Sequence, residues 1–366
     1  MTGDKKKLLF LVPAFPGGVG GAERVITTLL RHLDRGRFDC HLALAQSGNA
    51  YLENVPEWVS LHQIRASRMR YTLPGIIRLV RKLRPQTILS TVGYLNVMLI
   101  AAKPFLPRGV RIILREATTP SAFIAKETAH PRQWTWFYRH FYPRAHKIIC
   151  LSDSIMEEMA IRFAIPRQKL IRIYNPVDIT ILRLRADTQA NPYKESGPHL
   201  VAAGRLRSEK GFDLLLEAMP TIIRRHPVVK LAVLGEGPDE ADLREQAVRL
   251  GIREHVDFLG FKDPPWPYFR HADLLVMPSR HEGMPNAVLE ALALGTRVVA
   301  TDCPGGIREI AQTGAQIMLV APESPEALAE GILAALQRGK EQAPVGMAWL
   351  KEFEVEHIAA EYSRLF

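Results

Sequence analysis

Two basic residues in the second half of the chain could bind a diphosphate. Arg205 and Lys210 lie in a loop that begins at Gly204, directly after an apolar run typical of a strand. A planar guanidinium and a compact ammonium both suit phosphate oxygens. A solvated basic loop is the alternative, but the glycines on either side make it less favoured. The loop therefore predicts an anion site at the end of a strand.

Residues 282–290 form a second chemically suggestive stretch, Glu-Gly-Met-Pro-Asn-Ala-Val-Leu-Glu. Pro285 and Asn286 are typical of a helix start, which places Glu282 in the approach loop and Glu290 about one turn inside the helix. Carboxylates can hold sugar hydroxyls, and backbone N–H groups before a helix can face a phosphate. The glutamates could instead only complement the helix dipole. Together with the basic loop, this stretch favours a site that holds a phosphate and sugar hydroxyls.

A glycine-rich segment, residues 17–21, follows the first apolar run and precedes a helical pattern. Glycine there lets backbone N–H groups approach an anion. The segment is not a P-loop, because no Lys-Ser/Thr follows, and Glu23 occupies the third glycine position of a dinucleotide fingerprint. A flexible connection between strand and helix is the other interpretation.

Several kinds of chemistry have no signature in the chain. No Asp-x-Asp occurs, the 12 histidines show no helical metal-binding pattern, and no Gly-x-Ser-x-Gly is present. Metal hydrolysis and acyl transfer are therefore disfavoured. We expect no metal ion and no cofactor.

The elements that position these residues alternate between short apolar runs and amphipathic stretches, which predicts parallel α/β sheets. We expect strands at 8–13, 41–45, 87–90, 111–115, 147–151, 200–204, 230–235, 256–259, 273–278, 297–301 and 315–320. We expect helices at 22–33, 73–83, 152–163, 212–225, 240–250, 286–294 and 325–338. Ligands of such sheets bind at the carboxyl ends of the strands.

The two series of elements predict two Rossmann-like domains that face each other across a cleft. The first spans residues 1–174 and the second 175–345, with a C-terminal helix in 346–366 that packs back on the first. An irregular polar stretch, residues 175–198, is the expected linker. The run Lys5–Lys7 before residues 8–15 imitates a signal peptide, but no small-x-small cleavage site follows. A buried first strand is the preferred interpretation.

Composition narrows the class of protein further. With 47% hydrophobic residues, the 366-residue chain is too apolar to be disordered, and its apolar stretches are too short to span a bilayer. Three separated cysteines indicate neither a disulfide framework nor a zinc site, and favour the reducing cytoplasm. Residues 1–174 carry 27 basic against 11 acidic residues, a net +16, whereas the remainder carries 21 against 27. The two halves therefore have different expected partners.

The combined motifs resemble the retaining glycosyltransferases of family four, which have the GT-B fold. The matching motifs are Gly-Gly-Ala-Glu-Arg at 20–24, Asn-Pro-Val-Asp at 175–178, Gly-Arg-Leu and Glu-Lys-Gly within 204–211, and Glu-x7-Glu at 282–290. The resemblance covers nearly the whole chain and is clearest from residue 200 to 309. It implies a metal-independent enzyme that moves a hexose or N-acetylhexosamine from a nucleotide donor, with UDP favoured.

The resemblance also implies roles for individual residues. Arg205 and Lys210 would stabilise the leaving diphosphate, Glu282 would contact the transferred sugar, and Glu290 the ribose. Many members carry a histidine near the end of a mid-domain strand, where this chain has Glu116. Glu116 would then face the sugar or the acceptor. Backbone groups would complete the donor site: Gly20, Gly21, Gly204, Gly260, Phe261, Gly283, Met284, Pro285 and Asn286.

Two basic, partly aromatic segments of the first half suggest the acceptor. Residues 65–84 contain seven basic residues, and residues 130–147 mix six aromatic residues with four Lys and Arg. Such segments suit an anionic membrane surface, although two amphipathic helices packed inward would show the same pattern. No nucleic-acid-binding motif is present. We expect a peripheral protein on the inner face of the cytoplasmic membrane, acting on a lipid-linked or growing glycan.

Two other functions are compatible with these residues. A nucleotide-sugar epimerase would use the same fold without a separate acceptor. A membrane-bound nucleotide-sugar sensor or scaffold would bind the donor without turnover. Because all the charged residues of the family motifs are present, transfer of a sugar is favoured. We expect this transfer to serve the synthesis of a cell-surface polysaccharide or glycolipid.

Overall fold

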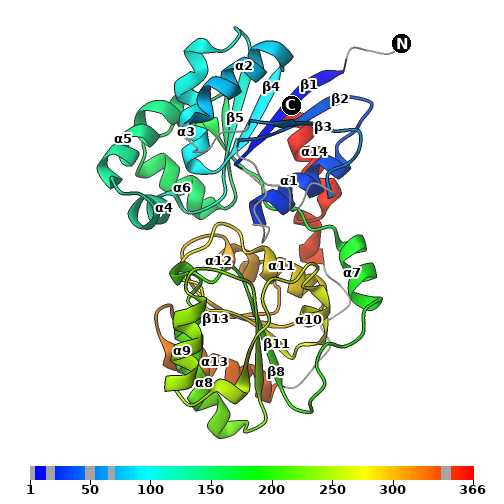
Figure 1. Ribbon diagram of the computed structural model, residues 1–366, viewed down its shortest axis with the longest axis vertical. Coiled ribbons are helices and arrows are strands. Elements are labelled where there is room, and N and C mark those ends of the chain that lie inside the picture. Colours follow the sequence, from blue (N-terminus) through cyan, green and yellow to red (C-terminus); the bar gives the residue numbers. More distant parts are fainter. Residues whose placement is uncertain (1–4, 14–20, 46–53, 65–70, 339–347) are drawn as a thin grey trace. The chain divides into compact units, whose positions relative to one another are not determined.

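The computed structural model describes residues 5–13, 21–45, 54–64, 71–338 and 348–366. The chain divides into two compact units, drawn in Figure 1. The first contains Met1–Pro176 and Val355–Phe366, and the second contains Val177–Glu354. The chain thus leaves the first unit after Pro176 and returns to it at Val355.

The described part of the first unit is built on a seven-stranded parallel sheet with the order β3-β2-β1-β4-β5-β6-β7. Leu8 to Val12 in β1 are all buried, which confirms the expected first strand. Strands buried on both faces are near-continuous apolar runs. The strands are β1 Lys6–Val12, β2 Phe38–Leu44, β3 Ser60–Gln63, β4 Thr87–Thr91, β5 Arg111–Glu116, β6 Lys147–Cys150 and β7 Leu170–Arg172.

The helices of the first unit include α3, which contains no charged residue. Seven of its ten residues are buried, so it is a core helix. No helix among the described residues is long and apolar enough to cross a membrane. The helices are α1 Gly21–His32, α2 Leu73–Leu83, α3 Gly93–Ala102, α4 Pro120–Glu127, α5 Pro131–Phe141, α6 Asp153–Ile161 and α14 Val355–Leu365, with short 3-10 turns η3 Lys103–Phe105, η4 Tyr142–Arg144 and η5 Arg167–Lys169.

The C-terminal helix α14 is part of the first unit although it follows the second in sequence. It packs against α1, and Tyr362 on it is fully buried. The Phe366 ring meets Phe10 of β1 edge to face, with 5.7 Å between the ring centroids. Aromatic burial therefore anchors the end of the chain to the sheet.

The second unit has a six-stranded parallel sheet within its described residues, in the order β10-β9-β8-β11-β12-β13. Its core joins the inward faces of the strands to α8 and α13, which pack against each other. Leu215, Met219 and Ile222 recur on one face of α8 at helical spacing. The strands are β8 His199–Ala203, β9 Lys230–Leu234, β10 Val256–Phe258, β11 Leu274–Met277, β12 Val298–Thr301 and β13 Ile317–Val320.

The helices of the second unit precede, connect or follow these strands along the chain. They are α7 Ile179–Asp187, α8 Phe212–Arg225, α9 Glu240–Arg249, α10 Trp266–His271, α11 Asn286–Ala293, α12 Ile307–Gln312 and α13 Pro325–Gln337, with 3-10 turns η6 Ser208–Lys210, η7 Arg253–His255 and η8 Ala348–Glu352. The expected helices 73–83 and 212–225 have the observed bounds. The other expected elements agree to within a few residues.

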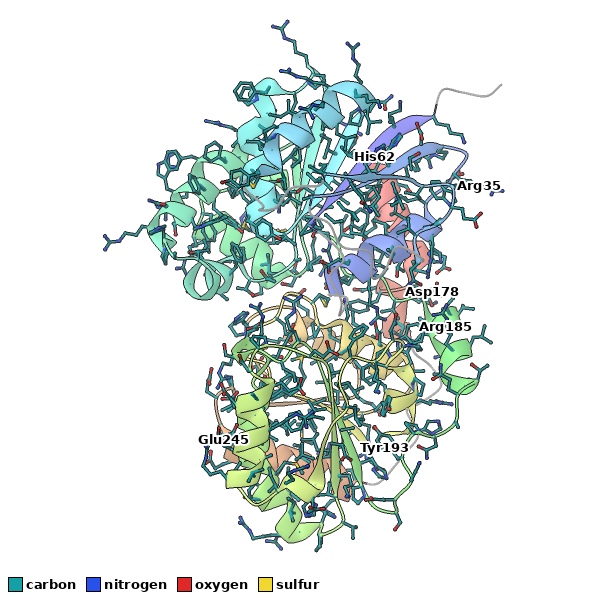
Figure 2. The ribbon with its side chains drawn as sticks, in the orientation of Figure 1. Arg35, His62, Asp178, Arg185, Tyr193 and Glu245 are labelled. Atoms are coloured by element: carbon teal, nitrogen blue, oxygen red, sulfur yellow. The ribbon has the colours of Figure 1, made fainter. Side chains whose placement is uncertain are left out.

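The expected irregular linker at 175–198 is wrong in its central part, which forms helix α7. Asp178 caps this helix by accepting a hydrogen bond from the Ile181 amide at 3.0 Å (Figure 2). Further along, the Tyr193 ring stacks on His199, with 4.3 Å between the ring centroids. The segment therefore packs on the second unit, a tertiary effect that polar composition does not reveal.

Candidate functional site

The carboxyl ends of β8 and β11 adjoin each other in the middle of the second sheet. From β8 the strand order runs outward through β9 to β10, and from β11 it runs the other way to β13. Such a reversal of order is where open α/β sheets bind ligands. The loops after β8 and β11 carry Lys210 and Glu282.

Lys210 and Glu282 form an ion pair, with 2.6 Å between Nζ and Oε1. The Ser279 hydroxyl donates to the same carboxylate oxygen at 2.7 Å. The Glu282 side chain is 9% exposed, whereas that of Lys210 is 26% exposed. The ammonium therefore remains accessible to an anion while the carboxylate holds it in place. Arg205, also in the loop after β8, is exposed.

The loop around Glu282 rests on the loop that follows β12. The Glu282 amide donates to the Pro304 carbonyl at 2.9 Å, and the Gly306 amide donates to the Gly283 carbonyl at 2.8 Å. Gly305 has φ +126°, and a Cβ there would lie 2.2 Å from the Glu282 carbonyl oxygen. Only glycine permits this approach. The chain thus holds residues 282–286 at the amino end of α11.

Helix α11 begins at Asn286, as predicted from Pro285 and Asn286, and Met284 before it is buried. Glu290 lies one turn inside the helix and is 8% exposed. The Trp266 indole N–H, at the start of α10, donates to Glu290 Oε2 at 2.9 Å. The sequence analysis missed Trp266, because residues on different elements show no common pattern in the sequence.

Gly260 and Phe261 lie in the loop after β10. The Gly260 carbonyl accepts from the Gly235 amide at 2.9 Å, and Phe261 is 37% exposed. The Phe261 amide donates to Glu236 Oε1 at 3.4 Å, a long hydrogen bond. Glu236, which the sequence analysis did not single out, follows β9. These residues lie at the same edge of the sheet as Lys210.

The remaining predicted site residues belong to the first unit. Gly21 is the first residue of α1. Gly20, with the rest of residues 17–20, lies outside the described residues. The role predicted for this segment therefore stays a prediction.

Glu116 ends β5 and is 2% exposed. Asn96 Nδ2 donates to its Oε1 at 2.9 Å, Tyr138 donates to Oε2 at 3.2 Å, and Tyr142 also donates to Oε1. Burial raises the pKa of Glu116 to about 7, against the opposing effect of these three hydrogen bonds. The carboxyl group thus joins β5 to α3 and α5. A role facing sugar or acceptor stays a prediction.

Two family models together cover most of the chain. One, described as Glycosyltransferase Family 4, matches residues 19–181, and the other, Glycosyl transferases group 1, matches residues 197–338. The chain belongs to glycosyltransferase family 4. The recognition made from the sequence motifs is therefore confirmed, and the chain is a glycosyltransferase.

This glycosyltransferase has relatives in bacterial glycan synthesis. It is 27% identical to N-acetylgalactosamine-N,N'-diacetylbacillosaminyl-diphospho-undecaprenol 4-alpha-N-acetylgalactosaminyltransferase of Campylobacter jejuni over 334 residues, 88% of each chain. It is 25% identical to the amylovoran biosynthesis glycosyltransferase AmsD of Erwinia amylovora, over 83% of each chain. Its fold matches that of Anabaena Alr3699/HepE, solved with UDP-glucose, with a TM-score of 0.78, 19% identity and 98% of each chain covered. The predicted α/β class with two wound parallel sheets is confirmed.

Proposed function

We propose that this glycosyltransferase moves a hexose or N-acetylhexosamine from a UDP-sugar to a lipid-linked or growing glycan, retaining the anomeric configuration. The observation that carries the proposal is the Lys210–Glu282 pair at the reversal of strand order. Support for the donor comes from the fold shared with Alr3699/HepE. Support for the acceptor comes from the undecaprenol-linked substrate in the Campylobacter relative's name.

The site residues have distinct parts in the proposed reaction. The bond between the anomeric carbon and the diphosphate oxygen breaks, and its electron pair stays on that oxygen. Lys210 and Arg205 stabilise the charge that develops there, and fixed cations do so without a metal. The acceptor hydroxyl oxygen forms the new bond to the anomeric carbon, and its proton passes to the leaving diphosphate oxygen. Glu282 holds both the Lys210 ammonium and a hydroxyl of the transferred sugar, and Glu290 holds the ribose.

A donor screen tests this proposal. We expect a UDP-sugar to raise the melting temperature of the purified protein more than a GDP-sugar does, and to be hydrolysed slowly in the absence of acceptor. Hydrolysis should persist in excess chelator, because Lys210 and Arg205 supply the positive charge that a metal ion supplies in metal-dependent enzymes. Complete loss that magnesium restores would contradict the metal-independent mechanism. Epimerised donor would favour an epimerase, and binding without any turnover would favour a sensor.

We further propose that the first unit contacts an anionic membrane surface. No aspartate or glutamate occurs between Trp58 and Arg115, whereas this segment has eleven Lys and Arg. Residues 65–70 lie outside the described residues, but in α2 the apolar Ile76 and Val80 are buried while Arg78, Arg81 and Lys82 are exposed. In the predicted aromatic segment, Trp136 is 50% exposed but Tyr138 and Tyr142 are buried. The support for membrane contact therefore comes mainly from the exposed basic residues and less from the aromatic ones.

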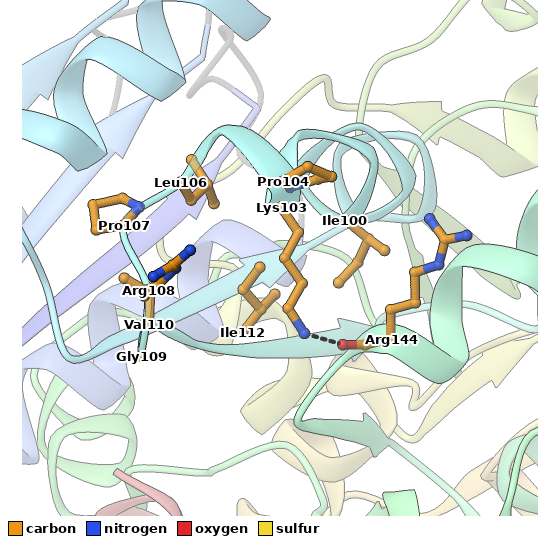
Figure 3. A pocket seen from close by; sticks show the side chains of 10 residues that line it. All are labelled: Ile100, Lys103, Pro104, Leu106, Pro107, Arg108, Gly109, Val110, Ile112 and Arg144. Atoms are coloured by element: carbon orange, nitrogen blue, oxygen red, sulfur yellow. Dashed lines mark hydrogen bonds between the residues drawn. The ribbon is translucent and has the colours of Figure 1, made fainter.

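A group of basic residues lies where the chain enters β5 and β6. Lys103, Arg108 and Arg144 line a pocket of ≈ 340 Å³ there, and Lys103 Nζ donates to the Arg144 carbonyl at 2.7 Å (Figure 3). Burial lowers the pKa of Lys169, and the charges of Lys103 and Lys147 lower it further. Phe105 beside the pocket is 58% exposed. Positive charge next to an exposed aromatic ring suits phosphate headgroups.

Charge removal at this end of the sheet is expected to release the protein from membranes. Changing Lys82, Arg84, Arg108 and Arg144 to Gln should weaken co-sedimentation with anionic vesicles about 100-fold or more, since each basic residue contributes on the order of 1 kcal/mol. Binding should also fall between 0.1 M and 1 M salt, as the Debye length shortens from ~10 Å to ~3 Å. The matched control changes four exposed arginines of the second unit: Arg224, Arg225, Arg249 and Arg253. Equal loss in both variants, or indifference to lipid charge, would contradict the proposal.

A further inference from the structure

One arginine, close in sequence to Glu282, connects three separate segments of the second unit. Arg280 follows β11, and its side chain is 17% exposed. Nη1 and Nη2 donate to the two carboxylate oxygens of Asp213 at 2.8 and 2.7 Å. Nη1 also donates to the Ser208 carbonyl at 2.6 Å, and Nε donates to Glu323 Oε2 at 3.0 Å. A single guanidinium therefore joins turn η6, helix α8 and the loop after β13.

The main chain reinforces this connection. The Arg280 amide donates to the Glu209 carbonyl at 2.9 Å, so side chain and backbone together hold the first two residues of η6. The third residue of η6 is Lys210. Two residues after Arg280, in the same loop, is Glu282, the ion-pair partner of Lys210. The loop after β11 thus holds the Lys210 ammonium directly, through Glu282. It holds the backbone of the Lys210 turn through Arg280.

The electrostatics keep this arrangement ionised. Burial acts to raise the pKa of Asp213, but hydrogen bonding to Arg280 and its charge outweigh that effect, so the pKa lies below its ordinary value. Hydrogen bonding to Asp213 raises the pKa of Arg280 above its ordinary value. A lysine would keep the charge but could not make the planar, forked set of bonds.

We propose that Arg280 is a positioning residue that holds turn η6 so that the Lys210 ammonium meets the leaving diphosphate. The effect on turnover rests on the proposed function. The contact between Arg280 and turn η6 does not depend on any ligand. Its physical basis is preorganisation: a charge-stabilising group displaced by 1 Å can cost about 10²-fold in rate. Arg280 touches no reacting atom, so its effect on turnover passes through Lys210.

The first test needs no substrate. Hydrogen exchange is measured by mass spectrometry on the full chain, for wild type, Arg280→Lys and the matched control Arg244→Lys. Arg244 makes a similar two-bond contact with Glu240 Oε1, at 2.9 and 2.8 Å, on helix α9 of the same unit. We expect amides 206–211 to exchange at least about 10-fold faster in Arg280→Lys only, while peptides from β8 and β9 stay protected. Unchanged exchange of 206–211 would overturn the proposal.

The second test asks whether Arg280 acts through Lys210. Turnover of the UDP-sugar identified by the screen is compared for Arg280→Lys, Lys210→Ala and the double variant. We expect Arg280→Lys to lower kcat about 10-fold, and the double variant to be no more than about twofold worse than Lys210→Ala alone. Multiplied losses would overturn the coupling to Lys210. If wild type turns over no nucleotide-sugar, the proposed function fails, while hydrogen exchange still decides whether Arg280 holds the turn.

Discussion

Replacing Lys210 or Arg205 with alanine is expected to lower turnover about 100-fold or more. Each substitution removes positive charge from the place where the leaving diphosphate becomes more negative, so the loss falls on the transition state. In Lys210→Ala, the 9% exposed Glu282 also loses its ion-pair partner. We therefore expect this variant to be the less stable of the two. Steady-state kinetics with the identified UDP-sugar measures the effect.

The control for these variants is Arg249→Ala, which removes an exposed positive charge from the end of α9. We expect its turnover to stay within about twofold of wild type. Circular dichroism before each assay checks that all three variants are folded. Near wild-type turnover in folded Lys210→Ala or Arg205→Ala would show that these cations do not stabilise the leaving group.

Replacing Gly211 with alanine is expected to damage both stability and activity. Gly211 has φ +66°, and a Cβ there would lie 2.0 Å from the Pro278 carbonyl oxygen, at the end of β11. The substitution must push the Lys210 turn away from the loop that carries Arg280 and Glu282. We expect the melting temperature to fall by about 5 °C or more, together with weaker binding of the nucleotide.

Gly251→Ala is the matched control, because Gly251 has nearly the same backbone angle, φ +69°, and no described residue other than its chain neighbours lies within 4 Å of its added Cβ. That variant carries only the cost of the left-handed conformation, roughly 1 kcal/mol or about 2–4 °C. Differential scanning calorimetry of both variants separates conformational strain from the steric overlap. If the two variants lost equal stability, the close contact between residue 211 and the Pro278 carbonyl oxygen would contribute nothing to the free energy of unfolding.

The local features of the site were predictable from the sequence, but the supporting contacts were not. Pro285 and Asn286 mark the start of α11 through preferences of adjacent residues, so the loop position of Glu282 followed directly. Ser279 and Arg280, which precede Glu282 by three and two residues, carried no distinguishing signal. Their importance comes from partners such as Asp213, 67 residues away in the chain. Trp266 was missed for the same reason.

The edge strands of the first sheet show what prediction from sequence missed in the fold. Strand β3, with the sequence Ser-Leu-His-Gln, is mostly exposed and has no apolar run, and β7 is only three residues long. Both form because an adjacent strand, β2 or β6, offers unpaired backbone groups. Helix α7 likewise depends on its packing against α10 and α11. Such elements lack the periodicity on which prediction from sequence relies.

The sequence alone determined the alternating strands and helices, the family, and the loops that carry Lys210, Glu282 and Glu290, because periodicity, capping and motif spacing are properties of adjacent residues. Only the tertiary structure decided that Lys210 and Glu282, 72 residues apart, form an ion pair, and that Arg280 contacts the turn that carries Lys210. It also decided that Glu116, which the sequence analysis placed facing the sugar or the acceptor, is buried among Asn96, Tyr138 and Tyr142. These outcomes depend on strand order and on desolvation, which arise only when distant segments pack together.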